Sequence, residues 1–314
     1  MKSPNLFKQF SLPASEVEAV EQSVANILGV ECLEIAPFDS IGKISTVYSC
    51  TVENEKYIVK HSYSGNTLQK DEYASRFATP ELPVPEVLGV KKLPDGSIIG
   101  VSRFMPGHEM LDTDFTVDNP FMKNVLATLR NIHTTDIGDS HGYGFAKANG
   151  QGAYPKPLFS GRARYPLEMG YWRFLAKRST ELKPPVFKEA LVTHIQLGRF
   201  CITPRMLYHG DIKADNILVH SGSVSAVLDW GRFGYGDPAV DLGIIYSRYP
   251  GAIDNEAYCK TIGLTPKNIR QRVLYYAMSE CVVSIAFNGK RQDNANRQES
   301  EHRLLELAEE AKKL

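Results

Sequence analysis

The residues most suited to chemistry lie in a polar loop, at positions 208–216, and at the end of an apolar run that follows it. The loop holds Asp211 and Asn216 and leads directly into an apolar run at 217–219, and a second apolar run ends at Asp229. If the two runs pair as a β-hairpin, these three polar side chains gather at one end of it. Carboxylate and amide oxygens without a His or Cys partner suit Mg²⁺, which normally shares its coordination shell with substrate phosphates.

The order of these residues resembles the catalytic loop of protein kinases, His-Arg-Asp-x-x-x-x-Asn, which is followed by an acidic metal ligand. Gly210 stands in place of the Arg, and Asp-Trp-Gly at 229–231 stands in place of Asp-Phe-Gly. At both positions the sequence resembles the aminoglycoside phosphotransferase and choline kinase families, whose members phosphorylate small molecules. The resemblance extends over about residues 38–287 and is most specific between residues 208 and 241.

The resemblance implies an α+β, two-lobed protein-kinase-like fold. Residues 1–104 would form a nucleotide-binding lobe, an antiparallel β-sheet with a helix, and residues 105–314 a mainly helical catalytic and substrate-binding lobe. The Pro106-Gly107 pair supports a boundary at this point, because both residues interrupt regular structure. Apolar residues at helical spacing predict helices at 16–28, 67–78, 120–133, 166–177 and 187–200.

The activity that the resemblance implies is transfer of the γ-phosphoryl group of ATP or GTP to an alcohol. Asp211 would accept the proton of the acceptor hydroxyl or orient that hydroxyl, and Lys213 would stabilise charge on the transferring phosphate. Asn216 and Asp229 would hold Mg²⁺. A nucleotide-binding pseudokinase that acts as a scaffold is the non-enzymatic alternative, and the complete set of these residues with Lys60 disfavours it.

The N-terminal half supplies candidates for binding the phosphates. Lys60 ends an apolar strand and resembles the kinase lysine that contacts the inner phosphates. Such a lysine needs an acidic partner on the helix predicted at 67–78, and Glu72 is the first choice and Asp71 the second. The resemblance does not decide between these two neighbouring acids, because one sequence does not fix the register of the helix.

Two further segments are candidates for nucleotide contacts. The loop at 39–46 takes the place of the phosphate-covering loop of kinases but holds one Gly, so a plain hairpin turn is the alternative. Within it, Ser45 and Thr46, or nearby backbone N–H groups, would bind phosphate oxygens. By the same resemblance, backbone groups around Arg103, Phe104 and Met105 would hydrogen-bond to the purine edge.

Three short stretches are similar to aminoglycoside phosphotransferases: Pro-Val-Pro-Glu-Val-Leu at 83–88, Gly-Tyr-Gly-Phe at 142–145 and Trp-Arg-Phe-Leu at 172–175. The last two resemble especially the hygromycin-type members, which implies an aminoglycoside acceptor and a role in antibiotic resistance. A metabolic kinase for choline, a fructosamine, a sugar or homoserine is the first alternative, and a macrolide kinase is the second.

An aminoglycoside is cationic, so acidic side chains in the C-terminal half are candidates to contact it. The acids considered are Asp237, Glu280, Asp293 and Glu299. Asp237 and Asp241 together also resemble a pair of acidic residues that holds the catalytic loop in place in this superfamily. We interpret Asp241 as structural rather than catalytic.

The composition excludes several classes of protein. The chain has 36 Lys and Arg against 36 Asp and Glu, so no overall charge favours nucleic acid or an anionic membrane. The five cysteines are scattered and form no Cys-x-x-Cys pair, which disfavours a disulfide framework or a zinc site and fits a reducing compartment. We expect a cytoplasmic protein from these features, and the resemblance to small-molecule kinases implies a monomer whose partner is a small hydroxylated molecule.

Overall fold

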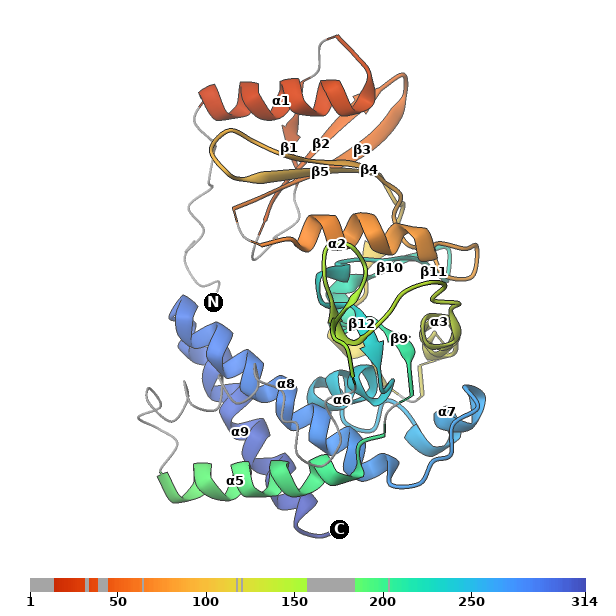
Figure 1. The fold of residues 1–314 in the computed structure, drawn as a ribbon, viewed down its shortest axis with the longest axis vertical. Coiled ribbons are helices and arrows are strands. Elements are labelled where there is room, and N and C mark those ends of the chain that lie inside the picture. Colours follow the sequence, from red (N-terminus) through yellow and green to blue (C-terminus); the bar gives the residue numbers. More distant parts are fainter. Residues whose placement is uncertain are drawn as a thin grey trace.

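The structure is a computed structural model, and it describes residues 14–31, 34–38, 45–63, 65–116, 118–119, 121–156, 184–202 and 204–314. Figure 1 shows a smaller lobe, built on a β-sheet, above a larger lobe in which most of the helices gather. The α+β, two-lobed fold predicted from the sequence is confirmed. The division at residues 104 and 105 stays a prediction, as does the helix at 166–177, which lies outside the described residues.

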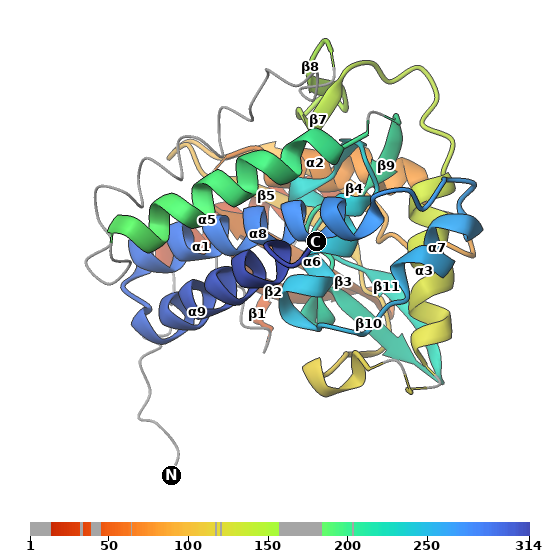
Figure 2. The same ribbon diagram turned by 90° about the horizontal axis from the view of Figure 1, so that it is seen from below.

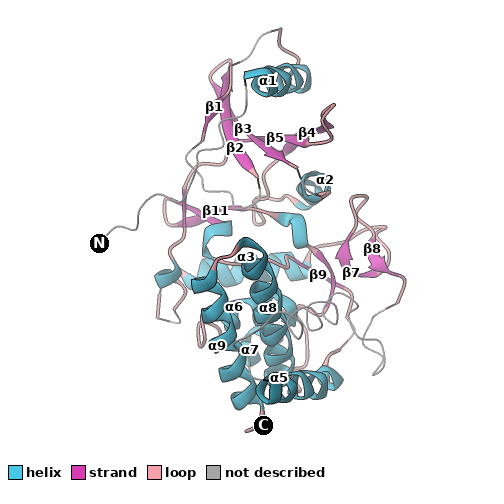
Figure 3. Ribbon diagram, turned by 90° about the vertical axis from the view of Figure 1, so that its left-hand side faces the viewer, coloured by secondary structure: helices cyan, strands magenta, loops and turns pink. Residues whose placement is uncertain are grey.

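The smaller lobe is one antiparallel sheet of five strands in the order β1-β2-β3-β5-β4. Its strands are β1 (Ala36–Pro37), β2 (Thr46–Val52), β3 (Glu55–Ser62), β4 (Val87–Lys92) and β5 (Ile98–Arg103). The side chains of Val59, Ile99 and Val101 are fully buried and pack with α1 (Ala14–Leu28), whose Val20 and Val24 are also buried. Helix α2 (Thr67–Ala74) packs beside β4 and β5 and faces the larger lobe (Figure 3).

The larger lobe is organised around α8 (Ile269–Arg291), which is buried along most of its length. A helix that is covered on all sides belongs to the interior of a domain, and α8 packs against several neighbours. These are α5 (Pro184–Leu197), α6 (Ala239–Arg248), α7 (Asn255–Thr261) and α9 (Asn294–Ala311). Figure 2 shows α5, α8 and α9 side by side, and α3 (Met122–Thr134) on the other side of the lobe.

Short strands form two further sheets in the larger lobe. One sheet has the order β11-β10-β6, and a second has the order β8-β7-β12-β9. Their bounds are β6 (His108–Glu109), β7 (Tyr143–Ala146), β8 (Gly152–Tyr154), β9 (Met206–Tyr208), β10 (Ile217–His220), β11 (Ser223–Val227) and β12 (Gly234–Gly236). No helix among the described residues is long and apolar enough to cross a membrane.

The hairpin expected from the sequence is formed by β10 and β11. Ile217 pairs with Val227, and beyond this pair the N–H of Leu228 donates to the carbonyl of Asn216 at 2.8 Å. The end of β11 and the start of β10 therefore meet, which brings the residues that precede one strand close to those that follow the other.

A buried ion pair ties α8 to the start of α6. The guanidinium of Arg272 donates to the carboxylate of Asp237, and both side chains are fully buried. The same carboxylate accepts a hydrogen bond from the N–H of Ala239 at 3.0 Å. The prediction that Asp237 contacts the substrate is therefore wrong, because its charge is enclosed within the lobe and already satisfied.

We expect Arg272→Leu to lower the free energy of unfolding by about 3–5 kcal/mol, because it leaves the carboxylate of Asp237 buried without a cation. Arg270→Leu is the matched control. Arg270 is 62% exposed and pairs with Glu310 on the surface, so its loss should cost less than about 1 kcal/mol. Urea denaturation of both variants measures the difference, and equal effects would contradict this assignment.

Candidate active site

The carboxylate of Asp241, which is buried on α6, holds the loop that leads into β10 in place. Asp241 accepts hydrogen bonds from the N–H groups of His209, at 2.8 Å, and Gly210, at 2.7 Å. Its other contact is the ring of His133 on α3, at 3.0 Å. Burial alone would raise the pKa of Asp241, but these partners hold it below its ordinary value. The carboxylate therefore stays charged and fixes the backbone just before Asp211.

Gly210 explains why this loop departs from the protein-kinase pattern. Its φ is +78°, in the left-handed region, and a Cβ at this position would lie 2.2 Å from the carbonyl oxygen of Arg232. No larger residue fits without moving one of the two segments. The close approach places Arg232, from the turn after Asp229, beside the carboxylate of Asp211.

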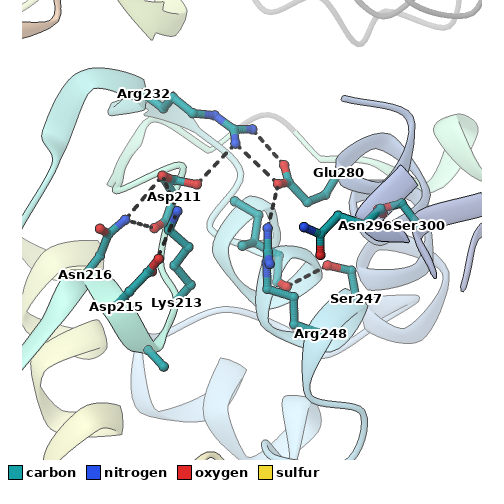
Figure 4. Close-up of polar contacts among 12 residues, drawn as sticks. Asp211, Lys213, Asp215, Asn216, Arg232, Ser247, Arg248, Glu280, Asn296 and Ser300 are labelled. Atoms are coloured by element: carbon teal, nitrogen blue, oxygen red, sulfur yellow. Dashed lines mark hydrogen bonds and ion pairs between the residues drawn. The ribbon is translucent and has the colours of Figure 1, made fainter. Parts of the chain in front are cut away.

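Asp211 lies at the centre of a polar cluster (Figure 4) and its side chain is only 14% exposed. Its Oδ2 is 3.2 Å from Nδ2 of Asn216 and 3.4 Å from Nζ of Lys213, and its Oδ1 is 3.3 Å from the guanidinium of Arg232. Burial raises the pKa of Asp211, but the charges of Arg232 and Lys213 more than offset this and lower it. The group is therefore an ionised carboxylate at neutral pH.

Asn216 and Asp229 lie at the open end of the hairpin, where the N–H of Leu228 donates to the carbonyl of Asn216 at 2.8 Å. The amide nitrogen of Asn216 donates to the backbone carbonyl of Asp211 at 2.8 Å, which fixes the orientation of the amide group. Asp229 has a left-handed backbone, with φ of 60° and ψ of 68°, so the chain turns sharply into Trp230.

These oxygens fit a metal that takes only part of its shell from the protein. Within the described part of the chain, no three His, Cys, Asp or Glu side chains cluster to hold an ion by themselves. One amide oxygen and one carboxylate would leave most positions to phosphate oxygens and water. That division is typical of Mg²⁺ bound together with a nucleotide.

Lys60 lies on β3 and points toward the junction of the lobes. Its Nζ is 3.3 Å from Oδ2 of Asp71, whose Oδ1 accepts from the N–H of Trp230 at 2.8 Å. Burial disfavours the charge of Lys60, but the carboxylates of Asp71 and Asp229 hold its pKa above the ordinary value. The prediction that Glu72 pairs with Lys60 is wrong. Glu72 is exposed, because the next residue on a helix points about 100° away.

A cavity of about 290 Å³ opens beside Lys60 between the two lobes. Its walls are apolar on both sides, with Ile58 and Val84 from the smaller lobe and Leu218 and Leu228 from the larger one. A cavity with two apolar walls accepts a flat ring, and the charged side chains at its end can bind a polar group attached to that ring. The remaining polar residues that line it include Asp71, Asp229, His108 and Glu109.

The segment predicted to meet the purine edge also lines this cavity. The N–H groups of Arg103 and Phe104 donate to the carbonyls of Glu86 and Lys56, so the N–H of Met105 is the best candidate donor. The side chain of Arg103 pairs with Glu55 and Glu86 on the surface instead. Contacts of this segment with a purine, and of Ser45 and Thr46 with phosphate, stay predictions.

A family model described as the phosphotransferase enzyme family matches residues 36–263 of the sequence. The chain belongs to this family. Hygromycin-B 4-O-kinase from Escherichia coli is 24% identical over 226 residues, which are 69% of this chain and 65% of that protein. The match therefore spans just under two thirds of the relative's length.

Solved structures of this family share the fold. A thermostable mutant of aminoglycoside phosphotransferase APH(4)-Ia, in ternary complex with AMP-PNP and hygromycin B, superposes with a TM-score of 0.77 at 20% identity, over 93% of this chain and 98% of that one. The GDP complex of aminoglycoside 2'-phosphotransferase-IIIa gives 0.62 at 12% identity, over 95% and 99%. At these identities the likeness establishes the fold alone.

Two of the predicted substrate contacts have other partners in the structure. Glu280 on α8 is buried and pairs with Arg232, at 2.7 Å, and with Arg248 on α6, at 3.7 Å. Glu280 is therefore already paired with two arginines, and its contact with a cationic substrate stays a prediction. Asp293 accepts from the N–H of Asn296 and begins α9, so any further role for it stays a prediction.

Arg232 and Arg248 are the residues that the sequence did not reveal. Arg232 contacts the carboxylate of Asp211 directly, and Arg248 contacts the same glutamate as Arg232. Arg232 follows Asp229 by three residues, so the sequence could have predicted that Arg232 lies near this site. The sequence could not have predicted that Arg248 lies there, because this depends on how α6 packs on α8.

We expect Asp71→Asn to weaken nucleotide binding roughly 10- to 100-fold, since it removes a charged hydrogen bond that orients Lys60. Glu72→Gln, the adjacent exposed acid of the same helix, is the control and should bind as the native protein does. Calorimetric titration with Mg-ATP and with Mg-GTP provides the measurement. A larger loss in the Glu72 variant would show that the pairing changes when the nucleotide binds.

Proposed function

We propose that this protein transfers the γ-phosphoryl group of ATP or GTP to a hydroxyl group of a small molecule. The observation that carries the proposal is the surroundings of Asp211, an ionised carboxylate between Asn216 on one side and Arg232 on the other. Lys60, from the smaller lobe, is close enough to Asp229 at the end of the hairpin for that carboxylate to help raise its pKa. Transfer of a phosphoryl group needs this combination of an oriented acceptor and fixed positive charge.

Each residue has a defined part in the proposed reaction. Asp211 would orient the acceptor hydroxyl and take its proton at the end of the transfer, and Lys213 would stabilise charge on the transferring group. Asn216 and Asp229 would hold Mg²⁺, which when bound would offset the charge of the phosphates. Lys60, held by Asp71, would fix the inner phosphates.

The first candidate for the acceptor is an aminoglycoside of the hygromycin type, with resistance to that antibiotic as the biological outcome. Its support is the similarity to hygromycin-B 4-O-kinase and to the APH(4)-Ia complex with hygromycin B. Consumption of a nucleoside triphosphate agrees with the cytoplasmic location expected from the scattered cysteines. The bound nucleotides of the similar structures, AMP-PNP and GDP, leave ATP and GTP as equal candidates.

The second candidate is a metabolic kinase with a different acceptor. The observation that favours it is the exposure of Arg232 and Arg248, which are 32% and 40% exposed beside a glutamate, Glu280, that is 5% exposed. Asp215 of the same loop is 49% exposed. The exposed charges near Asp211 are therefore of both signs and do not select a cationic acceptor.

We expect Asp211→Asn to lower kcat roughly 100-fold or more, because the hydroxyl loses its oriented proton acceptor. Asp215→Asn is the matched control. Asp215 lies in the same loop but is 49% exposed, and its ion pair within the described residues is with Lys213 at 3.6 Å. A panel of aminoglycosides, macrolides, choline and sugars with Mg-ATP or Mg-GTP gives the rates, and mass spectrometry detects the added phosphate. Native-like turnover by the Asp211 variant would remove the proposed base.

The pH dependence follows from the lowered pKa of Asp211. The carboxylate works only when ionised, so kcat/KM should hold constant as the pH falls toward about 4, the ordinary aspartate pKa, and decline only below it. Lys213→Met removes one of the charges that lower this pKa and should move the acid limb to higher pH. An acid limb near neutrality in the native enzyme would contradict this account.

A further inference from the structure

We propose that Tyr258 and His133 are positioning residues for the proposed phosphoryl transfer. The tyrosine hydroxyl fixes the ring of His133, and this ring fixes the carboxylate that holds the loop around Asp211. The inference rests on the proposed function and adds a remote residue to its machinery. It is carried by hydrogen bonds that run without a break from α7, through α3 and α6, to the backbone beside Asp211.

Three buried side chains from three helices form this connection. Oη of Tyr258, on α7, is 2.7 Å from Nδ1 of His133, on the neighbouring α3 (Figure 2). Nε2 of the same ring is 3.0 Å from Oδ2 of Asp241, on α6. The exposed fractions of Tyr258, His133 and Asp241 are 4%, 1% and 0%. Because these groups are closed off from solvent, water is a poor replacement for any partner that is removed.

The donor and the acceptor of each hydrogen bond can be assigned. Burial would raise the pKa of Asp241, but its partners hold it below the ordinary value, so the carboxylate accepts and His133 donates from Nε2. Burial keeps the pKa of Tyr258 well above its ordinary value, so the hydroxyl retains its hydrogen. Within the described part of the chain, His133 is the hydrogen-bond partner of this hydroxyl. A donor that faces Nδ1 selects the tautomer with its hydrogen on Nε2.

The hydroxyl therefore decides how the ring meets Asp241. Without it, a buried Nδ1 has no donor, and the ring relieves this cost by changing its tautomer or its rotation. Oδ2 of Asp241 accepts from the ring and also from the N–H of His209, at 2.8 Å. A change in the ring thus alters the place of the carboxylate oxygen that holds the loop.

His209 carries such a change to two parts of the site. Its Nδ1 accepts from the N–H of Asp211 at 3.2 Å, and its Nε2 donates to the carbonyl of Leu228 at 3.0 Å. Leu228 directly precedes Asp229. A shift of His209 therefore reaches both the proposed base and the proposed metal ligand. Reacting groups displaced by about 1 Å can lose roughly 100-fold in rate.

The first test removes the hydroxyl and keeps the aromatic ring. With Mg-ATP or Mg-GTP and the best acceptor of the panel, we expect Tyr258→Phe to lower kcat roughly 5- to 20-fold. The KM of the nucleotide should change by less than about 3-fold, because the cavity between the lobes is lined by residues outside this loop. Tyr246→Phe is the matched control and should keep its kcat. It loses a hydroxyl that donates to Glu310, and it lies on the same helix as Asp241.

Variants of His133 separate positioning from packing. His133→Gln keeps one acceptor and one donor at about the spacing of the ring nitrogens, whereas His133→Leu keeps an apolar side chain and loses both. We expect the Gln variant to retain more of kcat, and equal or better activity of the Leu variant would overturn the proposal. In the His133→Leu background, Tyr258→Phe should lower kcat no further, since the hydroxyl acts through the ring. Two losses that simply multiply would contradict this.

Hydrogen exchange tests the same claim without any acceptor. In the full chain, Tyr258→Phe should speed exchange of the peptide that covers residues 206–216 and leave α8 as in the native protein, and Tyr246→Phe should change neither. Native-like exchange of this peptide, or faster exchange throughout the chain, would overturn the proposal. If no acceptor is phosphorylated, the proposed function fails, and the exchange of this peptide still decides whether Tyr258 positions the loop.

Discussion

One buried carboxylate fixes the position of the loop that carries the proposed chemistry. Asp241 is completely enclosed, and a buried charge is costly unless every lone pair is used. It is satisfied by the ring of His133 and by two consecutive N–H groups, those of His209 and Gly210. The loop that holds Asp211 is therefore attached to α6 and α3 through this carboxylate, in addition to the buried apolar side chains of Ile212 and Ala214. Asp211 follows directly after His209 and Gly210, so the same hydrogen bonds fix the position of its backbone.

A second constraint joins the lobes. Asp71 contacts Lys60 of the smaller lobe with one oxygen and the N–H of Trp230 in the larger lobe with the other. The next residue back, Lys70, donates to the carbonyl of Gly231 at 3.0 Å. Helix α2 thus holds the turn after Asp229 as well as the lysine. A bound nucleotide would lie between parts whose spacing is already set, which lowers the cost of ordering them.

The sequence predicted the residues whose positions follow from local structure and missed those that depend on packing. Asp211 and Asn216 are brought together by a short loop and a hairpin, so their spacing in the chain was sufficient. The partner of Lys60 was misassigned because two adjacent acids satisfy the same motif, and the packing of α2 against the larger lobe decides between them. Arg232 and Glu280 lie 48 residues apart in the sequence and meet because α8 packs close to the turn after Asp229. Periodicity carries no information about such a contact.

The central claim is that Asn216 and Asp229 hold one metal ion with the nucleotide while Asp211 faces the acceptor. A crystal structure with Mg²⁺ and a non-hydrolysable ATP or GTP analogue tests it most directly. The account predicts an ion bound by the amide oxygen of Asn216 and the carboxylate of Asp229, with Lys60 on the inner phosphates and Asp211 next to the terminal one. An ion or triphosphate bound elsewhere, or bound without these two ligands, would contradict it.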